Sequence, residues 1–164
     1  KKSNCRKLSL NQYEDLVVNG NTIITSSVIL NKKNIKVDLT FSEEIKKAGW
    51  EDYDLWLNLA KSGYKFGFIK NCLGNYYLGN DNFDSPKKIL ENIDFMHESI
   101  FKKYLLDHPS RQIWWTNYTK GIAYYHLNDK SQSYAYFSIV LKSSSPLLNK
   151  FKALFYILLK LPKL

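Results

Sequence analysis

The pattern of apolar residues changes near residue 85, and this change constrains the fold more than any other feature of the chain. Before it lies Thr22–Leu30, a run rich in β-branched residues that favours a buried strand. After Pro86, apolar residues recur at three- and four-residue steps, the spacing of an amphipathic helix. The sequence therefore predicts an α/β part over residues 1–85 and an α-helical extension over residues 86–164.

The first part is predicted to hold one helix and two further strands besides Thr22–Leu30. The helix is expected to begin at Glu51, because acidic residues in a first turn complement the helix dipole. It is expected to end at Gly63, since glycine commonly stops a helix. Short strands are expected over Lys65–Ile69 and Cys72–Leu78, before a polar loop.

The second part is predicted to be entirely helical. A long helix follows Pro86 and is broken at Asp107-His108-Pro109. Helices over Ile113–Leu127 and Ser131–Lys142 are expected to form a hairpin, and a last helix covers Leu147–Leu161. The apolar stripe of the long helix consists of Ile89, Ile93, Met96, Ile100 and Tyr104.

Composition narrows the classes of function. The 164 residues carry a net charge of +9, but only Arg6 and Arg111 are arginine, the residue that base and phosphate recognition favours. Nucleic-acid binding is therefore not expected.

Cys5 and Cys72 belong to no paired-cysteine motif, and the 3 histidines lack metal-ligand spacing, so no metal site is expected within this chain. No apolar run approaches the ~20 residues that cross a bilayer.

The acidic cluster Glu51-Asp52-Tyr53-Asp54 has two interpretations. It can cap the predicted helix, where each acid in the first turn contributes roughly 0.3–1 kcal/mol through the dipole. Alternatively, it can hold a carboxylate at the edge of a cleft, where that group takes a proton from an acceptor hydroxyl.

The order and spacing of several segments carry a resemblance to a known family. Thr25-Ser26-Ser27 lies in a predicted strand, Phe41-Ser42-Glu43 follows it, and Glu51-Asp52 opens the predicted helix. Leu73-Gly74-Asn75-Tyr76-Tyr77 lies in the last predicted strand. Together, residues 19–85 resemble the second half of a family-two glycosyltransferase of the GT-A fold, a Rossmann-like α/β domain.

The resemblance implies an inverting transfer of a sugar from a nucleotide-sugar donor to an acceptor hydroxyl. The acceptor would be a glycan or a lipid-linked glycan, in the synthesis of cell-envelope polysaccharide or lipopolysaccharide. In the family the Asp of the Glu-Asp pair is usually the general base, so this role carries over to Asp52, with Glu51 as its neighbour on the acceptor side. The residues that carry over to the sugar and acceptor pocket are Thr25, Ser26, Ser27 and Trp50. The hydroxyl residues among them are equally well interpreted as ordinary strand residues.

Family members bind the nucleotide through the first half of the fold, where an Asp-x-Asp motif holds a divalent metal. The Asp-x-Asp tripeptide of this chain, Asp52-Tyr53-Asp54, lies inside the base motif instead. The resemblance therefore implies an acceptor-side half that is inactive alone. Mg²⁺ or Mn²⁺ is expected for the complete enzyme, with its ligands outside this chain.

The predicted hairpin supports a second hypothesis for the function. Gly121, Tyr124, Phe137 and Pro146 loosely resemble one tetratricopeptide-like helical pair, although Ser133 stands where that repeat prefers alanine. Such a pair either covers the flank of the α/β part or forms a docking surface. The alternative to a transferase is thus a non-catalytic helical adaptor built on a remnant transferase fold.

The last predicted helix combines apolar residues with lysines. After Asp129 the chain has no acidic residue, whereas Lys150, Lys152, Lys160 and Lys163 follow. A basic amphipathic helix over residues 147–164 fits the headgroup layer of an anionic membrane, and it fits equally well a core-facing helix with solvated lysines. The first interpretation predicts a cytoplasmic protein that is peripheral on the inner face of the membrane.

Overall fold

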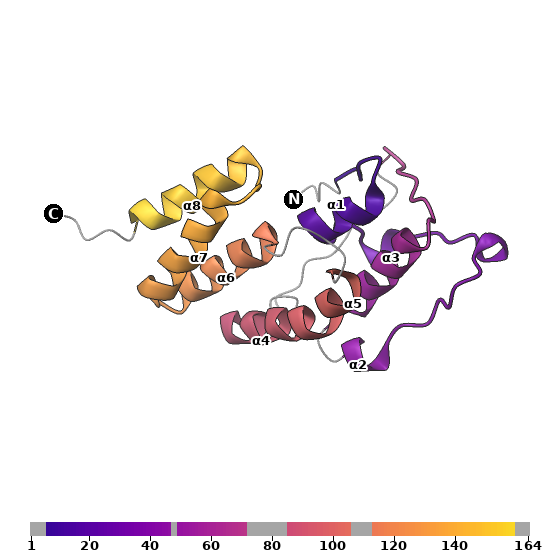
Figure 1. Ribbon diagram of the computed structural model, residues 1–164, viewed down its shortest axis with the longest axis horizontal. Coiled ribbons are helices and arrows are strands. Elements are labelled where there is room, and N and C mark those ends of the chain that lie inside the picture. Colours follow the sequence, from indigo (N-terminus) through magenta and orange to yellow (C-terminus); the bar gives the residue numbers. More distant parts are fainter. Residues whose placement is uncertain (1–5, 47–48, 72–84, 106–112, 160–164) are drawn as a thin grey trace. The chain divides into compact units, whose positions relative to one another are not determined.

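The computed structural model describes residues 6–46, 49–71, 85–105 and 113–159 (Figure 1). The chain divides into two compact units, Lys1–Tyr77 and Leu78–Leu164, whereas the sequence placed the boundary near residue 85. The elements of the first unit are α1 (Gln12–Asn19), the 3₁₀ turns η1 (Thr25–Ser27) and η2 (Lys32–Asn34), α2 (Glu43–Lys46) and α3 (Glu51–Lys61). Those of the second unit are α4 (Pro86–Met96), the π-helical segment η4 (His97–Phe101), α5 (Lys102–Leu105), α6 (Trp114–His126), α7 (Lys130–Lys142) and α8 (Leu147–Leu159).

The predicted α/β fold is wrong. The described residues form helices and turns but no strand, so residues 1–85 do not form the C-terminal half of a GT-A, Rossmann-like domain. Thr22–Leu30 holds only the turn η1, in which the Val28 N–H donates to the Thr25 carbonyl at 3.1 Å. β-Branched residues favour a strand where neighbouring strands pack against them, and this run has none within the described residues.

The prediction of a strand over Lys65–Ile69 is also wrong. This segment forms no regular element in the structure. The Phe66 ring instead packs edge-on against Trp56 of α3, with 6.1 Å between ring centroids. The predicted strand Cys72–Leu78 lies within residues 72–84, outside the described residues.

Helices α1 and α3 pack together to form the core of the first unit. Leu16 and Val17 of α1 are fully buried, and so is Tyr53 of α3, whose hydroxyl donates to the Leu16 carbonyl at 2.6 Å. Helix α3 begins at Glu51 as predicted, and its end is closed at Gly63, where φ is +85° and the N–H donates to the Ala60 carbonyl at 3.1 Å. A positive φ is easily adopted only by glycine, which explains this stop.

The predicted long helix after Pro86 is present as α4, η4 and α5 in direct succession. The Ser85 side chain accepts a hydrogen bond from the Lys88 N–H at 3.3 Å and so caps its start. Of the predicted apolar stripe, Ile93, Met96, Ile100 and Tyr104 are buried. The π-helical turn in the middle was not predicted.

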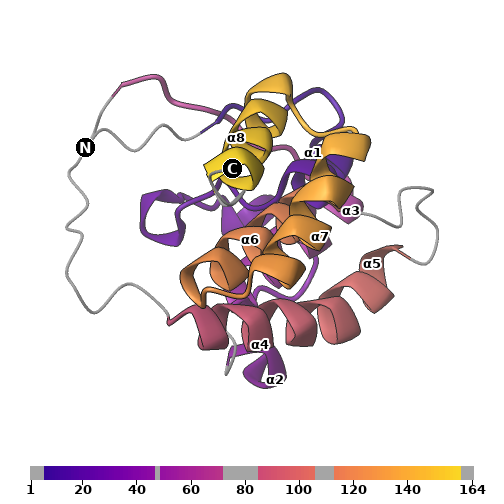
Figure 2. The same ribbon diagram turned by 90° about the vertical axis from the view of Figure 1, so that its left-hand side faces the viewer.

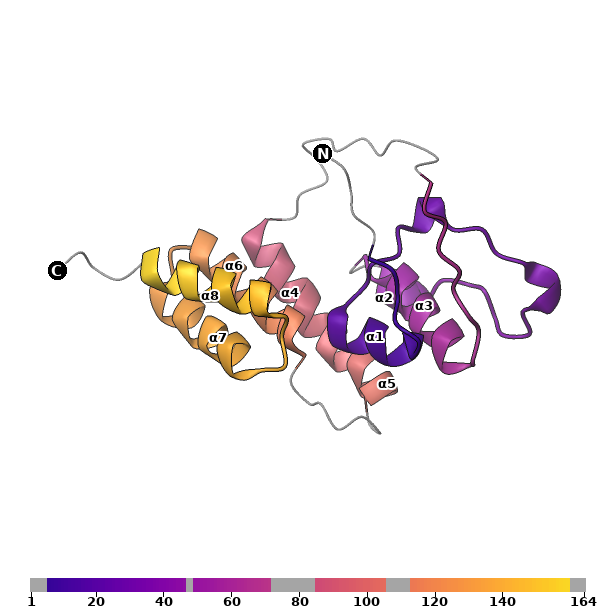
Figure 3. The same cartoon turned by 90° about the horizontal axis from the view of Figure 1, so that it is seen from above.

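Helices α6, α7 and α8 pack in succession, with α7 in contact with both others (Figures 2 and 3). Phe137, Val140 and Ala153 form the buried cluster at their centre. The turn between α6 and α7 lies at Asn128, which adopts a φ of +61°, and the Asp129 side chain caps α7. This is where the sequence predicted the hairpin turn.

Gly121 and Ser133 explain the close approach of α6 and α7. A Cβ atom on Gly121 would lie 2.8 Å from Cε1 of the buried Phe137 ring. The Ser133 hydroxyl is buried and donates to the Gly121 carbonyl at 3.1 Å. Serine therefore has a role here that alanine would not fill, which accounts for the departure from the tetratricopeptide pattern.

Candidate functional site

The first turn of α3 carries the carboxylates predicted to be catalytic. Gly49, with a φ of +70°, separates α3 from α2, and Trp50 is the N-cap residue of α3. Glu51 and Asp52 then occupy the first helical positions, where backbone N–H groups without helical partners and the helix dipole stabilise negative charge. The acidic first turn that predicted the start of the helix therefore also places Glu51 and Asp52 at its N-terminus.

Asp52 and Thr25 are in direct contact, although 27 residues separate them in the chain. The Thr25 hydroxyl donates to Oδ2 of Asp52 at 2.6 Å. This is the length expected of a hydrogen bond from a hydroxyl to an ionised carboxylate. Thr25 is exposed and Asp52 is partly exposed, so the carboxylate is within reach of a ligand from solvent.

Glu51 differs from Asp52 in its surroundings. Its Oε2 atom is buried and accepts no hydrogen bond from the described residues, although the residue as a whole is partly exposed. Trp50, the preceding residue, is partly buried, and its ring lies 6.1 Å from that of Tyr53 between centroids. The aromatic side chain of Trp50 therefore lies at the same helix end as the two acids.

The two predicted pocket serines do not approach Asp52 in the way Thr25 does. Ser26 and Ser27 are exposed in η1. The Ser27 hydroxyl donates to the Ile24 carbonyl at 2.7 Å, within its own turn. The structure thus brings Thr25 and Asp52 together, while Ser27 makes a local bond typical of serine in turns.

The arrangement presents a carboxylate that already accepts a hydrogen bond from an alcohol. A substrate hydroxyl that replaced the Thr25 hydroxyl would meet Oδ2 of Asp52 in a geometry suited to proton transfer. No cation is paired with Asp52 among the described residues, so the carboxylate is not engaged in a salt bridge there.

The residues described do not fit a divalent metal. In this part of the chain, no three His, Cys, Asp or Glu side chains gather closely enough to hold an ion. Glu51, Asp52 and Asp54 are close in sequence, but Asp54 is buried and Asp52 is bonded to Thr25. These three carboxylates therefore do not form a ligand set for Mg²⁺ or Mn²⁺.

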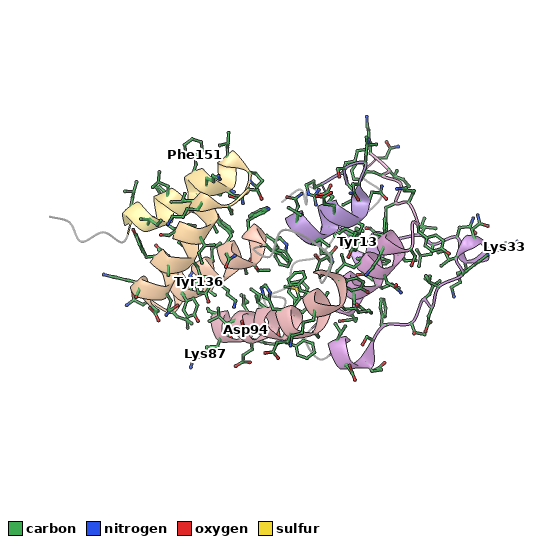
Figure 4. The ribbon with its side chains drawn as sticks, in the orientation of Figure 1. Tyr13, Lys33, Lys87, Asp94, Tyr136 and Phe151 are labelled. Carbon is green, nitrogen blue, oxygen red and sulfur yellow. The ribbon has the colours of Figure 1, made fainter. Side chains whose placement is uncertain are left out.

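A pocket in the second unit brings together residues that the sequence did not single out. Its volume is approximately 480 Å³, and Asp94 of α4 forms an ion pair with Lys120 of α6 at its wall. Asp94 is labelled in Figure 4. The lining residues are Asp94, His97, Glu98, Ile113, Asn117, Lys120 and Ile139.

His97 gives this pocket a titratable group. Burial lowers the pKa of the imidazole, the positive charge of Lys120 lowers it further, and Asp94 partly opposes the change. The ring is therefore neutral near neutral pH. One face of the helix carries Asp94, His97 and Glu98, at positions i, i+3 and i+4. This spacing is the signal from which the sequence could have indicated the pocket.

A second, smaller pocket in the first unit surrounds Asp15 and has a volume of approximately 270 Å³. Burial alone would raise the pKa of Asp15, but hydrogen bonds from Asn19, the Ser9 N–H and Arg6 outweigh it and lower the pKa overall. The carboxylate is thus held by several donors and fixes the segment before α1 to that helix.

Comparisons with known proteins give no further assignment. No protein family model, curated protein or solved structure matches the chain. Within the described residues, no helix combines the length and apolar character needed to cross a membrane.

Proposed function

We propose that this chain supplies the acceptor-side carboxylate of an inverting sugar transfer, with Asp52 as general base. Asp52 takes the proton of an acceptor hydroxyl as the hydroxyl oxygen bonds to the anomeric carbon of the donor sugar. The bond from that carbon to the nucleoside diphosphate breaks, and the diphosphate leaves with the electron pair. The observation that carries the proposal is the hydrogen bond from Thr25 to Asp52.

This hydrogen bond supports the proposal because it joins two residues that the resemblance assigns to one site. The contact brings the turn η1 to the start of helix α3. Thr25 then acts as a positioning residue, whose hydroxyl holds the carboxylate until an acceptor hydroxyl takes its place. The proposal assigns only the acceptor side to this chain, and leaves the donor nucleotide and its metal to other residues.

Glycan synthesis at the cell envelope is the biological setting of this proposal. The acceptor would be a glycan or lipid-linked glycan at the cytoplasmic face of the membrane. Trp50 offers an aromatic face at the helix end that carries Glu51 and Asp52, and aromatic rings suit the apolar faces of sugars.

The test measures sugar transfer by the natural gene product that contains this chain. Release of nucleoside diphosphate is followed with a panel of UDP-, GDP- and dTDP-sugars and a lipid and glycan extract of the source cells as acceptor. Asp52→Asn keeps the shape and removes the base, so we expect a loss of about 10²- to 10⁴-fold. Glu91→Gln, which neutralises an exposed acid on α4, is the matched control and keeps full activity.

Two Thr25 variants separate positioning from folding. Thr25→Ser keeps the hydroxyl and retains transfer, whereas Thr25→Val lowers kcat, because the Asp52 carboxylate loses the hydrogen bond that holds it in place. If Asp52→Asn transfers sugar as well as the unmodified protein does, the assignment of the base is wrong.

A helical interaction module is the second candidate. The observation that favours it is the separate buried cluster of α6, α7 and α8, which gives these helices a core of their own. Comparison of two variants in the source cells distinguishes the candidates. If the chain is an interaction module, cells with Asp52→Asn behave as wild type, and cells with a variant that disturbs the α6–α7 contact, such as Gly121→Ala, behave as if the protein were lost. If the chain is part of a transferase, Asp52→Asn has a strong phenotype.

A further inference from the structure

Helix α8 is apolar on two opposite sides. On the inner side, Ala153 is fully buried, and Tyr156 and Ile157 pack against Phe137 and Val140 of α7. The outer side consists of apolar side chains that are between 41% and 73% exposed. We call these residues the outer face of α8: Leu147, Leu148, Phe151, Leu154, Phe155, Leu158 and Leu159.

The outer face is continuous. At about 100° per residue, its positions occupy an arc of roughly 140° that is centred opposite Ala153, with no polar residue between them. Phe151, labelled in Figure 4, lies on the side of α8 that faces away from α6 and α7. Single exposed leucines are ordinary on protein surfaces, whereas a continuous apolar patch of this kind marks an interaction site.

Two lysines border the outer face. On the same helical projection, Lys150 lies at one edge of the arc and Lys152 at the other. Helix α8 contains no acidic residue, and none follows Asp129 in the chain. The arrangement is therefore an apolar strip between two positive edges, with no nearby acid on the helix to offset them.

We propose that the outer face of α8 binds the surface of an anionic membrane. The helix would lie in the plane of the interface, with its phenylalanine and leucine side chains among the acyl chains and both lysines at the headgroups. The charge pattern favours lipid phosphates over neutral surfaces, because both edges of the strip are positive. The described helix has 13 residues, fewer than the ~20 that cross a bilayer, so the proposed position is in the plane of the interface.

The proposal stands apart from sugar transfer, because membrane binding needs neither a donor nor the Asp52 carboxylate. Its structural basis is also separate, since α8 is held by its inner side and the outer face is free to bind without any rearrangement of the helices that the structure describes. Its success or failure therefore leaves the proposed function unaffected.

The test is vesicle co-sedimentation of the whole chain. Phosphatidylcholine vesicles are compared with vesicles that also contain phosphatidylglycerol. We expect binding at least about tenfold tighter to the anionic vesicles, reduced by high salt. Replacement of Lys150 and Lys152 by glutamine weakens binding to these vesicles by about fivefold for each lysine.

The apolar part is tested with Phe151→Gln combined with Phe155→Gln. Both side chains are at least 60% exposed, so the change leaves the core intact, and circular dichroism checks that the helices remain. We expect this variant to lose about tenfold or more in affinity for anionic vesicles. Ile29→Gln, at a position 88% exposed in the first unit, is the matched control and binds as the unmodified chain does.

Two outcomes overturn the proposal. The first is equal binding to anionic vesicles by the Phe151→Gln, Phe155→Gln variant and the unmodified chain. The second is that the unmodified chain does not bind vesicles but forms a dimer in sedimentation velocity, and that the Phe151→Gln, Phe155→Gln variant abolishes this dimer. The outer face would then be a contact between protein molecules.

Discussion

The side-chain amide of Gln12 forms hydrogen bonds with both backbone polar groups of Phe66. Its Nε2 donates to the Phe66 carbonyl at 2.8 Å, and its Oε1 accepts from the Phe66 N–H at 2.8 Å. This is the pairing that a neighbouring strand would offer to the same residue. One side chain of α1 thus replaces the sheet that the sequence predicted around Lys65–Ile69.

Replacement of Gln12 by alanine is expected to destabilise the first unit by about 1–2 kcal/mol, because it removes two hydrogen bonds to a partly buried segment. Hydrogen exchange at the Phe66 amide measures the local effect, and its protection is expected to fall. The matched control is Gln132→Ala at an exposed position of α7. Unchanged protection of the Phe66 amide in Gln12→Ala would contradict the role of this pairing.

Tyr53→Phe is expected to destabilise the same unit by about 1 kcal/mol. The hydroxyl is buried and donates to the Leu16 carbonyl at 2.6 Å, which ties α3 to α1. The cost stays modest because the Leu16 carbonyl also accepts from the Gly20 N–H at 3.0 Å and is not left without a donor. Urea unfolding measures the change. Tyr134→Phe, on the exposed side of α7, should leave the midpoint unchanged; a larger effect there than at Tyr53 would refute the argument.

Gly121→Ala is expected to destabilise the second unit by about 1–3 kcal/mol, despite the better helix propensity of alanine. The added methyl group would meet the Phe137 ring at 2.8 Å, and that ring is 1% exposed and has no room to retreat. Gly67→Ala adds the same methyl group where no atom lies within 4 Å, so it should have little effect. Thermal unfolding of both variants checks this difference, which equal melting temperatures would exclude.

The stability of the second unit is expected to fall as the pH drops below about 6.5. Burial and Lys120 lower the pKa of His97 in the folded state, so the unfolded chain binds the proton more readily. The unit therefore has its full stability at pH values above the pKa of His97 in the unfolded chain. It loses part of this stability as the pH falls from that value to the pKa of His97 in the folded state, and the loss levels off at lower pH. His97→Gln should flatten this part of the stability curve, whereas His126→Gln, at an exposed position, should not. Parallel curves for the two variants would rule out His97 as the cause.

Helix α3 shows what the sequence could predict. Its start at Glu51 and its stop at Gly63 depend on forces that act within one turn, namely charge against the dipole and the φ of a glycine. Such signals need no distant partner. The hairpin turn at Asn128 and the cap at Asp129 were predictable for the same reason.

Thr22–Leu30 shows where prediction failed. β-Propensity expresses how a side chain packs between strands, so it has no effect where the described structure offers no neighbouring strand. The run instead forms the turn η1, in which the Ser27 hydroxyl donates to the Ile24 carbonyl and the Val28 N–H donates to the Thr25 carbonyl. The hydrogen bond between Thr25 and Asp52 was not predicted, since the resemblance implied only that both residues belong to one acceptor site. The pocket around His97 depends on packing of α4, α6 and α7 that one sequence does not reveal.

The Phe137 ring lies between aromatic neighbours on α8 and α6. It stacks almost parallel on Tyr156 at 5.1 Å and meets Tyr118 at 63° and 5.8 Å, while its edge faces Gly121. A ring held this way cannot rotate unless α7 and α8 separate briefly. The protons on its two edges should therefore give separate nuclear magnetic resonance signals. The rate at which these signals exchange would measure how often α7 and α8 separate.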